Sequence, residues 1–151
     1  MNENKKYFLK ELGGRLHRWF VALIILGLIL TLGPQSFLSD FLQGLVQYHV
    51  PLCNYIVDGV MIFGIILIGV GGGIGFIGST LYDYPDVQPK LTAWSAWFAL
   101  GSLLINLLLI YLLYQYPRYS LPLGFLILVC LLIPLSALIT SLIVNHFVNK
   151  K

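Results

Sequence analysis

The stretch Gly64 to Ser79, GIILIGVGGGIGFIGS, places the strongest constraint on what this chain can fold into. Seven of its residues are glycine, most of the others are apolar, and no charged residue follows until Asp83. In a water-soluble helix each interior glycine costs about 1 kcal/mol relative to alanine. In a lipid bilayer, by contrast, glycine lets two helix backbones approach closely. The stretch therefore predicts a membrane-spanning helix that packs tightly against another helix.

The composition of the whole chain agrees with a membrane setting. Of its 151 residues, 58% are hydrophobic and 10% are charged, whereas a soluble domain carries about 25% charged residues. A membrane-spanning helix needs about 20 mostly apolar residues, so this length allows about four spans and no separate soluble domain. We predict an all-α integral membrane protein, a four-helix transmembrane bundle that forms a single domain over residues 1–151.

Four apolar segments carry the predicted spans, at about 17–33, 55–81, 91–114 and 121–147. As a helix, the second would extend for about 40 Å. This exceeds the ~30 Å hydrocarbon core, so the helix must tilt, protrude or break. The first could instead be a cleaved signal peptide, but no small-residue cleavage pattern precedes Pro34, which favours a retained span.

Two further helices are expected outside the spans. Apolar residues recur at helical spacing over about 36–50, which predicts an amphipathic helix in the membrane interface between spans one and two. The basic segment Lys5–Arg18 precedes the first span. It predicts a short helix at the membrane surface, broken at the pair Gly13-Gly14, because glycine is a poor helix former.

The distribution of positive charge predicts the orientation of the chain. With four spans, the two termini and the loop 82–90 share one side, and that side carries every Lys and Arg except Arg118. Because positive loops stay in the cytoplasm, both termini are predicted to be cytoplasmic, in a plasma or inner membrane. The net charge of +3 then reflects topology, and we predict no binding to nucleic acid.

Small residues of the second span fall on two helix faces. Gly71, Gly75 and Ser79 are spaced four residues apart, and Gly69 and Gly73 form a second such pair on an adjacent face. This spacing predicts helix packing, within the chain or between copies. The alternative is a helix break at residues 71–73, whose free carbonyls would line an ion or substrate site. No ionisable residue lies within the stretch to support such a site.

Weakly polar residues of spans three and four are predicted to face the interior of the bundle, because polar groups in lipid need partners. Tight packing is the favoured interpretation, and a modest cavity open to the cytoplasm is the alternative. Pro134 should kink the fourth span, since it removes the hydrogen bond to the Cys130 carbonyl. The candidates for lining a cavity are Ser95, Ser102, Asn106, Ser136 and Thr140.

Other chemistry-bearing residues are sparse. Asp58 lies one turn into the second span and is a candidate for an interfacial ion contact, at a depth that water reaches. The three histidines do not converge at one depth, and no Ser-His-Asp, Cys-His or paired-carboxylate arrangement is expected. We therefore predict that the chain is not an enzyme and has no metal or other cofactor.

These observations favour a non-catalytic integral membrane protein that acts through helix–helix contacts. Its partners would be the lipid bilayer and other membrane helices, in a homo-oligomer or a larger complex in which the chain is an accessory or assembly subunit. The alternative is a small transporter or channel with a polar cavity in its cytoplasmic half. The absence of a deeply buried ionisable residue for coupling weakens this alternative.

Overall fold

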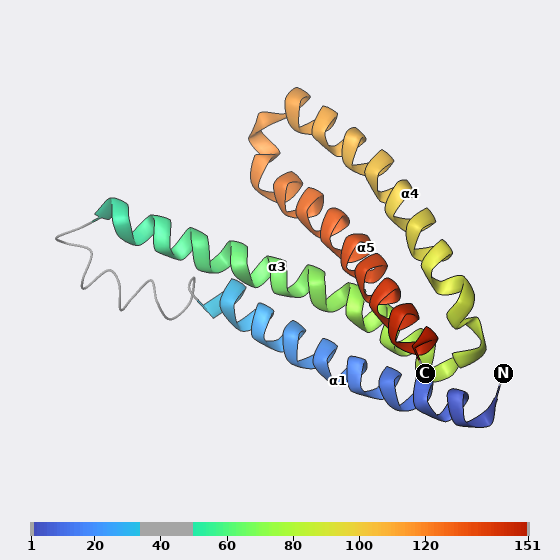
Figure 1. Cartoon of the computed structure of the whole chain (residues 1–151). Helices are drawn as coiled ribbons and strands as arrows, with labels where there is room; N and C mark the ends of the chain where they lie inside the picture. Colours follow the sequence, from blue (N-terminus) through green and yellow to red (C-terminus); the bar gives the residue numbers. More distant parts are fainter. Residues whose placement is uncertain (1, 34–49, 151) are drawn as a thin grey trace.

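The computed structural model describes residues 2–33 and 50–150, which are almost entirely helical (Figure 1). Its long helices are α1 (Glu3–Gly33), α3 (Val50–Asp83), α4 (Gln88–Gln115) and α5 (Ser120–Asn149). Two short 3-10 helices, η2 (Pro85–Val87) and η3 (Pro117–Tyr119), connect α3 to α4 and α4 to α5. The four long helices are each long and apolar enough to cross a membrane, which confirms the predicted number of candidate spans.

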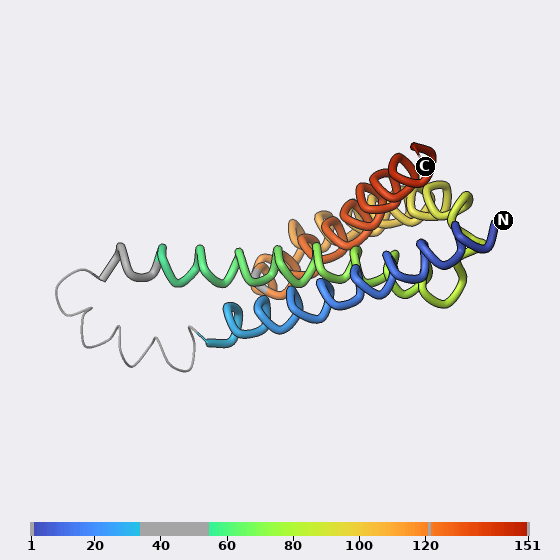
Figure 2. The backbone as a smooth tube through the Cα atoms, turned by 60° about the horizontal axis from the view of Figure 1, so that its bottom comes forward, coloured from blue at the N-terminus to red at the C-terminus, as the bar shows by residue number. Residues whose placement is uncertain are grey.

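The helices pack as an open row in the order α1, α3, α5, α4. Helix α3 packs against both α1 and α5, and α4 packs against α5. Within the described residues, α1 and α4 form the two edges of the row and share no extended contact. The N-terminus and the C-terminus lie at the same end of the molecule (Figure 2).

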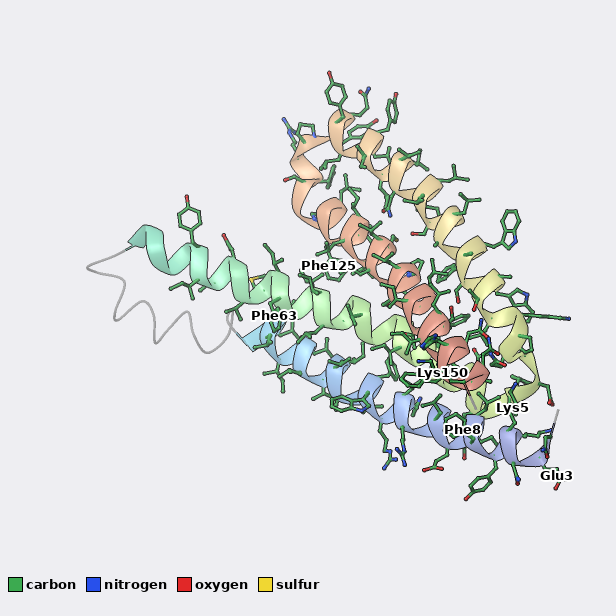
Figure 3. The ribbon with its side chains drawn as sticks, viewed as in Figure 1. Glu3, Lys5, Phe8, Phe63, Phe125 and Lys150 are labelled. Carbon is green, nitrogen blue, oxygen red and sulfur yellow. The ribbon has the colours of Figure 1, made fainter. Side chains whose placement is uncertain are left out.

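The row is closed at the end that carries the termini and open at the other. Figure 1 shows the pair α1–α3 and the pair α4–α5 meeting at the terminal end and diverging away from it. The buried apolar core lies at the terminal end and includes Leu9, Ile77, Leu81 and Val144. On the diverging halves, Phe63 of α3 and Phe125 of α5 are exposed (Figure 3). Among the described residues, the buried apolar core therefore joins the two helix pairs at the terminal end.

The expected break in the N-terminal segment is wrong, because α1 runs without interruption from Glu3 to Gly33. Gly13 lies directly against the backbone of α3, where a Cβ atom would be 2.7 Å from the Tyr82 nitrogen. One turn earlier, Leu9 is fully buried. Packing against α3 therefore stabilises the helix through the glycine pair, in spite of the low helix propensity of glycine.

Helix α3 is likewise continuous through residues 71–73, so the alternative of a helix break is wrong. None of the described glycines has a positive φ. The helix extends beyond the predicted span at both ends, from Val50 to Asp83. The predicted interfacial helix at 36–50 falls, except for its last residue, on residues 34–49, which lie outside the described part of the chain.

Candidate functional site

Glycines from both helices interlock at the contact between α1 and α3. A Cβ atom on Gly13 would be 2.8 Å from the carbonyl oxygen of Gly78, and one on Gly27 would be 2.7 Å from that of Gly64. These separations leave no room for a side chain. The first glycine pair lies near the terminal end and the second near the opposite end of α1, so α1 and α3 are in close contact along most of their shared length.

The first small-residue face of α3 is directed at α1. Gly71 lies against Leu23, where an added Cβ atom would be 3.1 Å from the Leu23 Cβ, and Gly75 lies against the ring of Phe20. Ser79 continues this face one turn further along. This predicted packing face is thus occupied within the chain by large apolar side chains of α1.

The second small-residue face of α3 is directed at α5. Gly69 lies against Leu132, and Gly73 lies against Ser136 and the carbonyl of Ile133. The Ser136 hydroxyl donates to the Ile133 carbonyl at 3.0 Å and is 3.4 Å from the Gly69 carbonyl oxygen. Both small-residue faces of α3 are therefore used inside the chain, one by each neighbouring helix.

A hydrogen bond between α4 and α5 compensates for the proline inside α5. Pro134 has no N–H group, so the carbonyl of Cys130 loses its usual partner within the helix. The hydroxyl of Ser102 donates a hydrogen bond to that carbonyl. The sequence indicates the free carbonyl, and the structure identifies the group that satisfies it.

Helix α4 also buries polar atoms that have no partner. Ser95 is 0% exposed and Asn106 is 5% exposed. Within the described residues, the Ser95 hydroxyl and both polar atoms of the Asn106 side chain make no hydrogen bond. These groups lie on one face of α4, together with Ser102. An unpaired buried amide is costly in an apolar environment, which marks Asn106 as a position to explain.

The five candidates for a polar cavity are not brought together. Ser136 faces α3 and Ser102 faces the backbone of α5, while Thr140 is half-buried on α5. A cavity of about 310 Å³ between α4 and α5 includes Ser102 but is otherwise lined by residues such as Phe98, Ile105 and Ile133. This cavity is mainly apolar. None of the three cavities described for the molecule gathers the five residues.

Polar side chains tie the helices together at the terminal end. Asn145 of α5 accepts hydrogen bonds from Gln88 of α4 at 3.1 Å and from Asn149 at 3.3 Å. Lys6 of α1 forms an ion pair with Asp86 of η2 at 3.2 Å. These contacts could not be predicted from the sequence, because the pairing depends on which helix ends meet. The nearest signal was the clustering of polar residues just beyond each apolar segment.

A groove with several polar residues in its lining, called the polar groove below, lies across α1 and α3 near the terminal end. It has a volume of about 370 Å³ and is lined by Gly14, His17, Ser79, Tyr82 and Asp83. The Ser79 hydroxyl is 3.5 Å from Nδ1 of His17. Sequence analysis predicted no Ser-His-Asp arrangement; the structure brings one residue of each type to the same groove.

The groove is nevertheless poorly arranged for acyl transfer. A tetrahedral intermediate requires hydrogen-bond donors aimed at its oxyanion, often backbone N–H groups. Ser79 lies inside the continuous helix α3, where backbone N–H groups are bonded to carbonyls one turn earlier. The described hydrogen bonds of His17 include none to Asp83, so no residue is shown orienting the imidazole. The groups in the groove are better suited to binding than to nucleophilic catalysis.

The remaining charged residues are dispersed. Asp58 is exposed near the start of α3, and the described part of the chain offers it no ion pair. A second cavity, of about 400 Å³, lies beside the chain termini and includes Lys5, Phe8 and Val148. Figure 3 shows Lys5 and Phe8 at the same end as Lys150. Among residues 2–33 and 50–150, no three His, Cys, Asp or Glu side chains are grouped so as to hold a metal ion.

Comparison with known proteins adds no assignment. No family model matches the sequence, and no curated protein and no solved structure resembles it significantly. The role of the chain must be inferred from its own contacts.

Proposed function

We propose that this chain is a multi-pass integral membrane protein that acts through helix–helix contacts, without catalysis. It would serve as an accessory or assembly subunit of a membrane complex, or associate with further copies of itself. Both termini would be cytoplasmic, since the positively charged side of a membrane protein faces the cytoplasm. Four apolar helices and the position of both termini at one end of the row support this placement.

The divergence of the two helix pairs is the observation that carries the proposal. In the diverging halves, Gly59 of α3 and Gly124 of α5 are open: among residues 2–33 and 50–150, a Cβ atom on either would meet nothing within 4 Å. Glycines in membrane helices permit close approach of another helix. Large apolar side chains flank these positions, including Ile62 and Phe125, which are exposed. A partner helix seated here would make the contacts that the chain itself leaves unmade.

Leucine substitutions at the two open glycines test this proposal. Gly59→Leu and Gly124→Leu should leave the fold intact, because each site is open. They should remove the partner in co-purification from native membranes, or reduce particle size in mild detergent. Gly101→Leu on α4, also an open position, is the matched control. Unchanged partners and unchanged size in both variants would falsify the proposal.

The glycines that the sequence analysis singles out are poor tools for this test. Leucine at Gly71 or Gly75 would collide with Leu23 or Phe20 and so disrupt the packing of α1 on α3. A lost partner would then be indistinguishable from misfolding. The open glycines avoid this ambiguity.

The alternative function, a small transporter or channel, is favoured by the unpaired Asn106 side chain. A polar side chain within a membrane helix is a candidate for substrate contact. Reconstituted protein should then move a solute or ion, and Asn106→Leu should alter that flux. Flux equal to that of empty liposomes across a broad panel of solutes would remove this alternative.

A further inference from the structure

The polar groove between α1 and α3 has the chemistry of a small binding site. Its lining residues include His17, Ser79, Tyr82 and Asp83, whose side chains carry an imidazole, two hydroxyl groups and a carboxylate. Gly14 contributes open space, because a Cβ atom there would reach only ordinary contact with the Tyr82 ring, at 3.8 Å. We propose that this groove binds the headgroup of a phospholipid that carries both a phosphate and a primary ammonium group.

The position of the groove matches the depth of lipid headgroups. Tyr82 lines the groove, Trp19 lies two residues beyond His17, and both aromatic side chains are exposed. Exposed tryptophan and tyrosine mark the membrane–water interface in helical membrane proteins. The inference rests on the proposed membrane placement of the chain, but it does not depend on a partner helix at the diverging end.

The hydrogen-bonding groups in the groove suit the two ends of such a headgroup. Phosphate oxygens accept hydrogen bonds, and the Tyr82 hydroxyl can donate one. Ser79 and His17 contact each other at 3.5 Å, so this pair offers one further donor, either the Ser79 hydroxyl or the ring N–H of His17 that does not face it. The Asp83 carboxylate only accepts when ionised, so it suits an ammonium group with N–H donors. A quaternary ammonium, which has no N–H, lacks this hydrogen bond.

The charges around the groove favour a zwitterionic ligand over a purely anionic one. Arg15 on the same helix is paired with Glu11 at 2.6 Å, so this pair adds little net charge. Arg18 is exposed and makes no ion pair within the described residues. Asp83 supplies a negative charge inside the groove. Because the charged residue in the groove lining is the acidic Asp83, a headgroup that carries an ammonium is favoured over one that carries only negative charge.

Lipid binding by the full-length chain in detergent tests the proposal. Native mass spectrometry would compare lipids with identical acyl chains and ethanolamine, choline or glycerol headgroups. The ethanolamine lipid should be retained best. Asp83→Asn should lower its affinity by about two- to fivefold, the range for an exposed ion pair, and should remove the preference over the choline lipid.

Two matched pairs of variants control for position and folding. Asp58→Asn makes the same charge change near the opposite end of α3 and should leave the lipid preference unchanged. Gly14→Ala should retain binding, whereas Gly14→Leu should fill part of the groove and weaken binding of every lipid. Circular dichroism and particle size would verify that each variant is folded.

The possible outcomes separate the lipid from other ligands. Soluble phosphoethanolamine carries the same groups without acyl chains, and it should displace the lipid only at much higher concentration. Equal displacement by soluble phosphoethanolamine or inorganic phosphate would overturn the assignment to a lipid. Equal retention of ethanolamine and choline lipids, or tightest binding of the glycerol lipid, would overturn the headgroup assignment. The Gly59→Leu and Gly124→Leu variants should lose the partner helix and still retain the lipid. Failure of the partner-helix proposal and failure of the lipid proposal can therefore be told apart.

Discussion

A single methyl group should have opposite consequences at two neighbouring glycines. Alanine at Gly13 would place a Cβ atom 2.7 Å from the backbone nitrogen of Tyr82, whereas at Gly14 the nearest atoms are in the Tyr82 side chain at 3.8 Å. Overpacking against rigid backbone costs about 1–3 kcal/mol. Gly13→Ala should therefore lower the free energy of unfolding in detergent by about that amount. Gly14→Ala should raise it by up to about 1 kcal/mol through helix propensity.

Thermal or denaturant unfolding of the two variants, side by side with the parent chain, provides the measurement. Each variant replaces glycine with alanine within the same helical turn, so the propensity contribution is nearly the same in both. The difference between them then isolates the contact with α3. Equal unfolding free energies would mean that α1 does not approach α3 as closely as the structure places it.

At the residue scale, the spacing of small residues predicted which of them share a helix face, but not which helix packs against that face. The spacing of Gly69, Gly71, Gly73 and Gly75 indicated two packing faces, because the helical period alone decides which residues share a face. It gave no indication that α1 would contact one face and α5 the other. That outcome depends on the relative rotation of separate helices, which no local pattern encodes.

The polar groove is a second case in which the sequence does not predict which helices meet. His17 and Ser79 are 62 residues apart, and they meet only because α1 and α3 pair in one particular register. The glycines near them, Gly13 and Gly78, are a signal that could have suggested this register, since close approach needs glycine on both helices. Without a known partner for either glycine, the meeting of the two side chains could not be predicted.

At the scale of elements, α5 depends on α4 for the integrity of its own backbone. Ser102→Ala should leave the Cys130 carbonyl unpaired and lower the free energy of unfolding by about 0.6–2 kcal/mol, the range for interhelical hydrogen bonds in membranes. In the background Pro134→Ala, the restored N–H group can bond to that carbonyl. Ser102→Ala should then cost much less.

A double-mutant cycle measures this dependence. The four proteins are the parent, the two single variants and the double variant, each unfolded under the same conditions. The cycle cancels side-chain propensity and the loss of apolar contact, and retains the coupling between the hydroxyl and the proline. Additive costs for the two substitutions would show that the Ser102 hydroxyl does not compensate for the proline.

The existence of the four long helices was predictable, because long apolar segments with few charges are a strong signal. The residues at which the helices begin and end were less predictable. The apolar segment predicted a first membrane span from about His17, with a break before it, whereas α1 continues back to Glu3. Local propensity disfavours helix at Gly13-Gly14, but burial of Leu9 and Gly13 against α3 outweighs it. Tertiary contact thus decided the extent of the helix.

For the whole molecule, the buried core, the hydrogen bonds of Asn145 and the ion pair all lie at the terminal end. We therefore predict that the helices move less at this end than at the diverging end. Spin labels at Phe63→Cys and Phe125→Cys report on the diverging end, and labels at Tyr82→Cys and Phe147→Cys report on the terminal end. All four side chains are exposed. With fewer contacts to restrain it, the diverging pair should show the broader distance distribution.

Pulsed electron spin resonance would measure both pairs in a background in which Cys53 and Cys130 are replaced by alanine. Replacing Cys130 with alanine is expected to have little effect on stability, because Ser102 donates its hydrogen bond to the carbonyl of Cys130 and not to its side chain. Distributions of equal width would contradict unequal motion. Narrowing of the diverging pair alone, on addition of a native partner, is the expected response if a partner helix is seated there.

The order of helices in the row has a consequence for how the chain is made. Helix α3 can pack on α1 as soon as it is inserted, but α4 is synthesised before α5, which supplies its main packing surface. In a membrane, α4 is therefore inserted next to α1 and α3 before α5 is present, and Ser95, Ser102 and Asn106 are not yet covered by α5. Insertion of α5 between α3 and α4 then completes the row. The slowest and most chaperone-dependent moment of biogenesis should accordingly fall between the synthesis of the third and the fourth long helix.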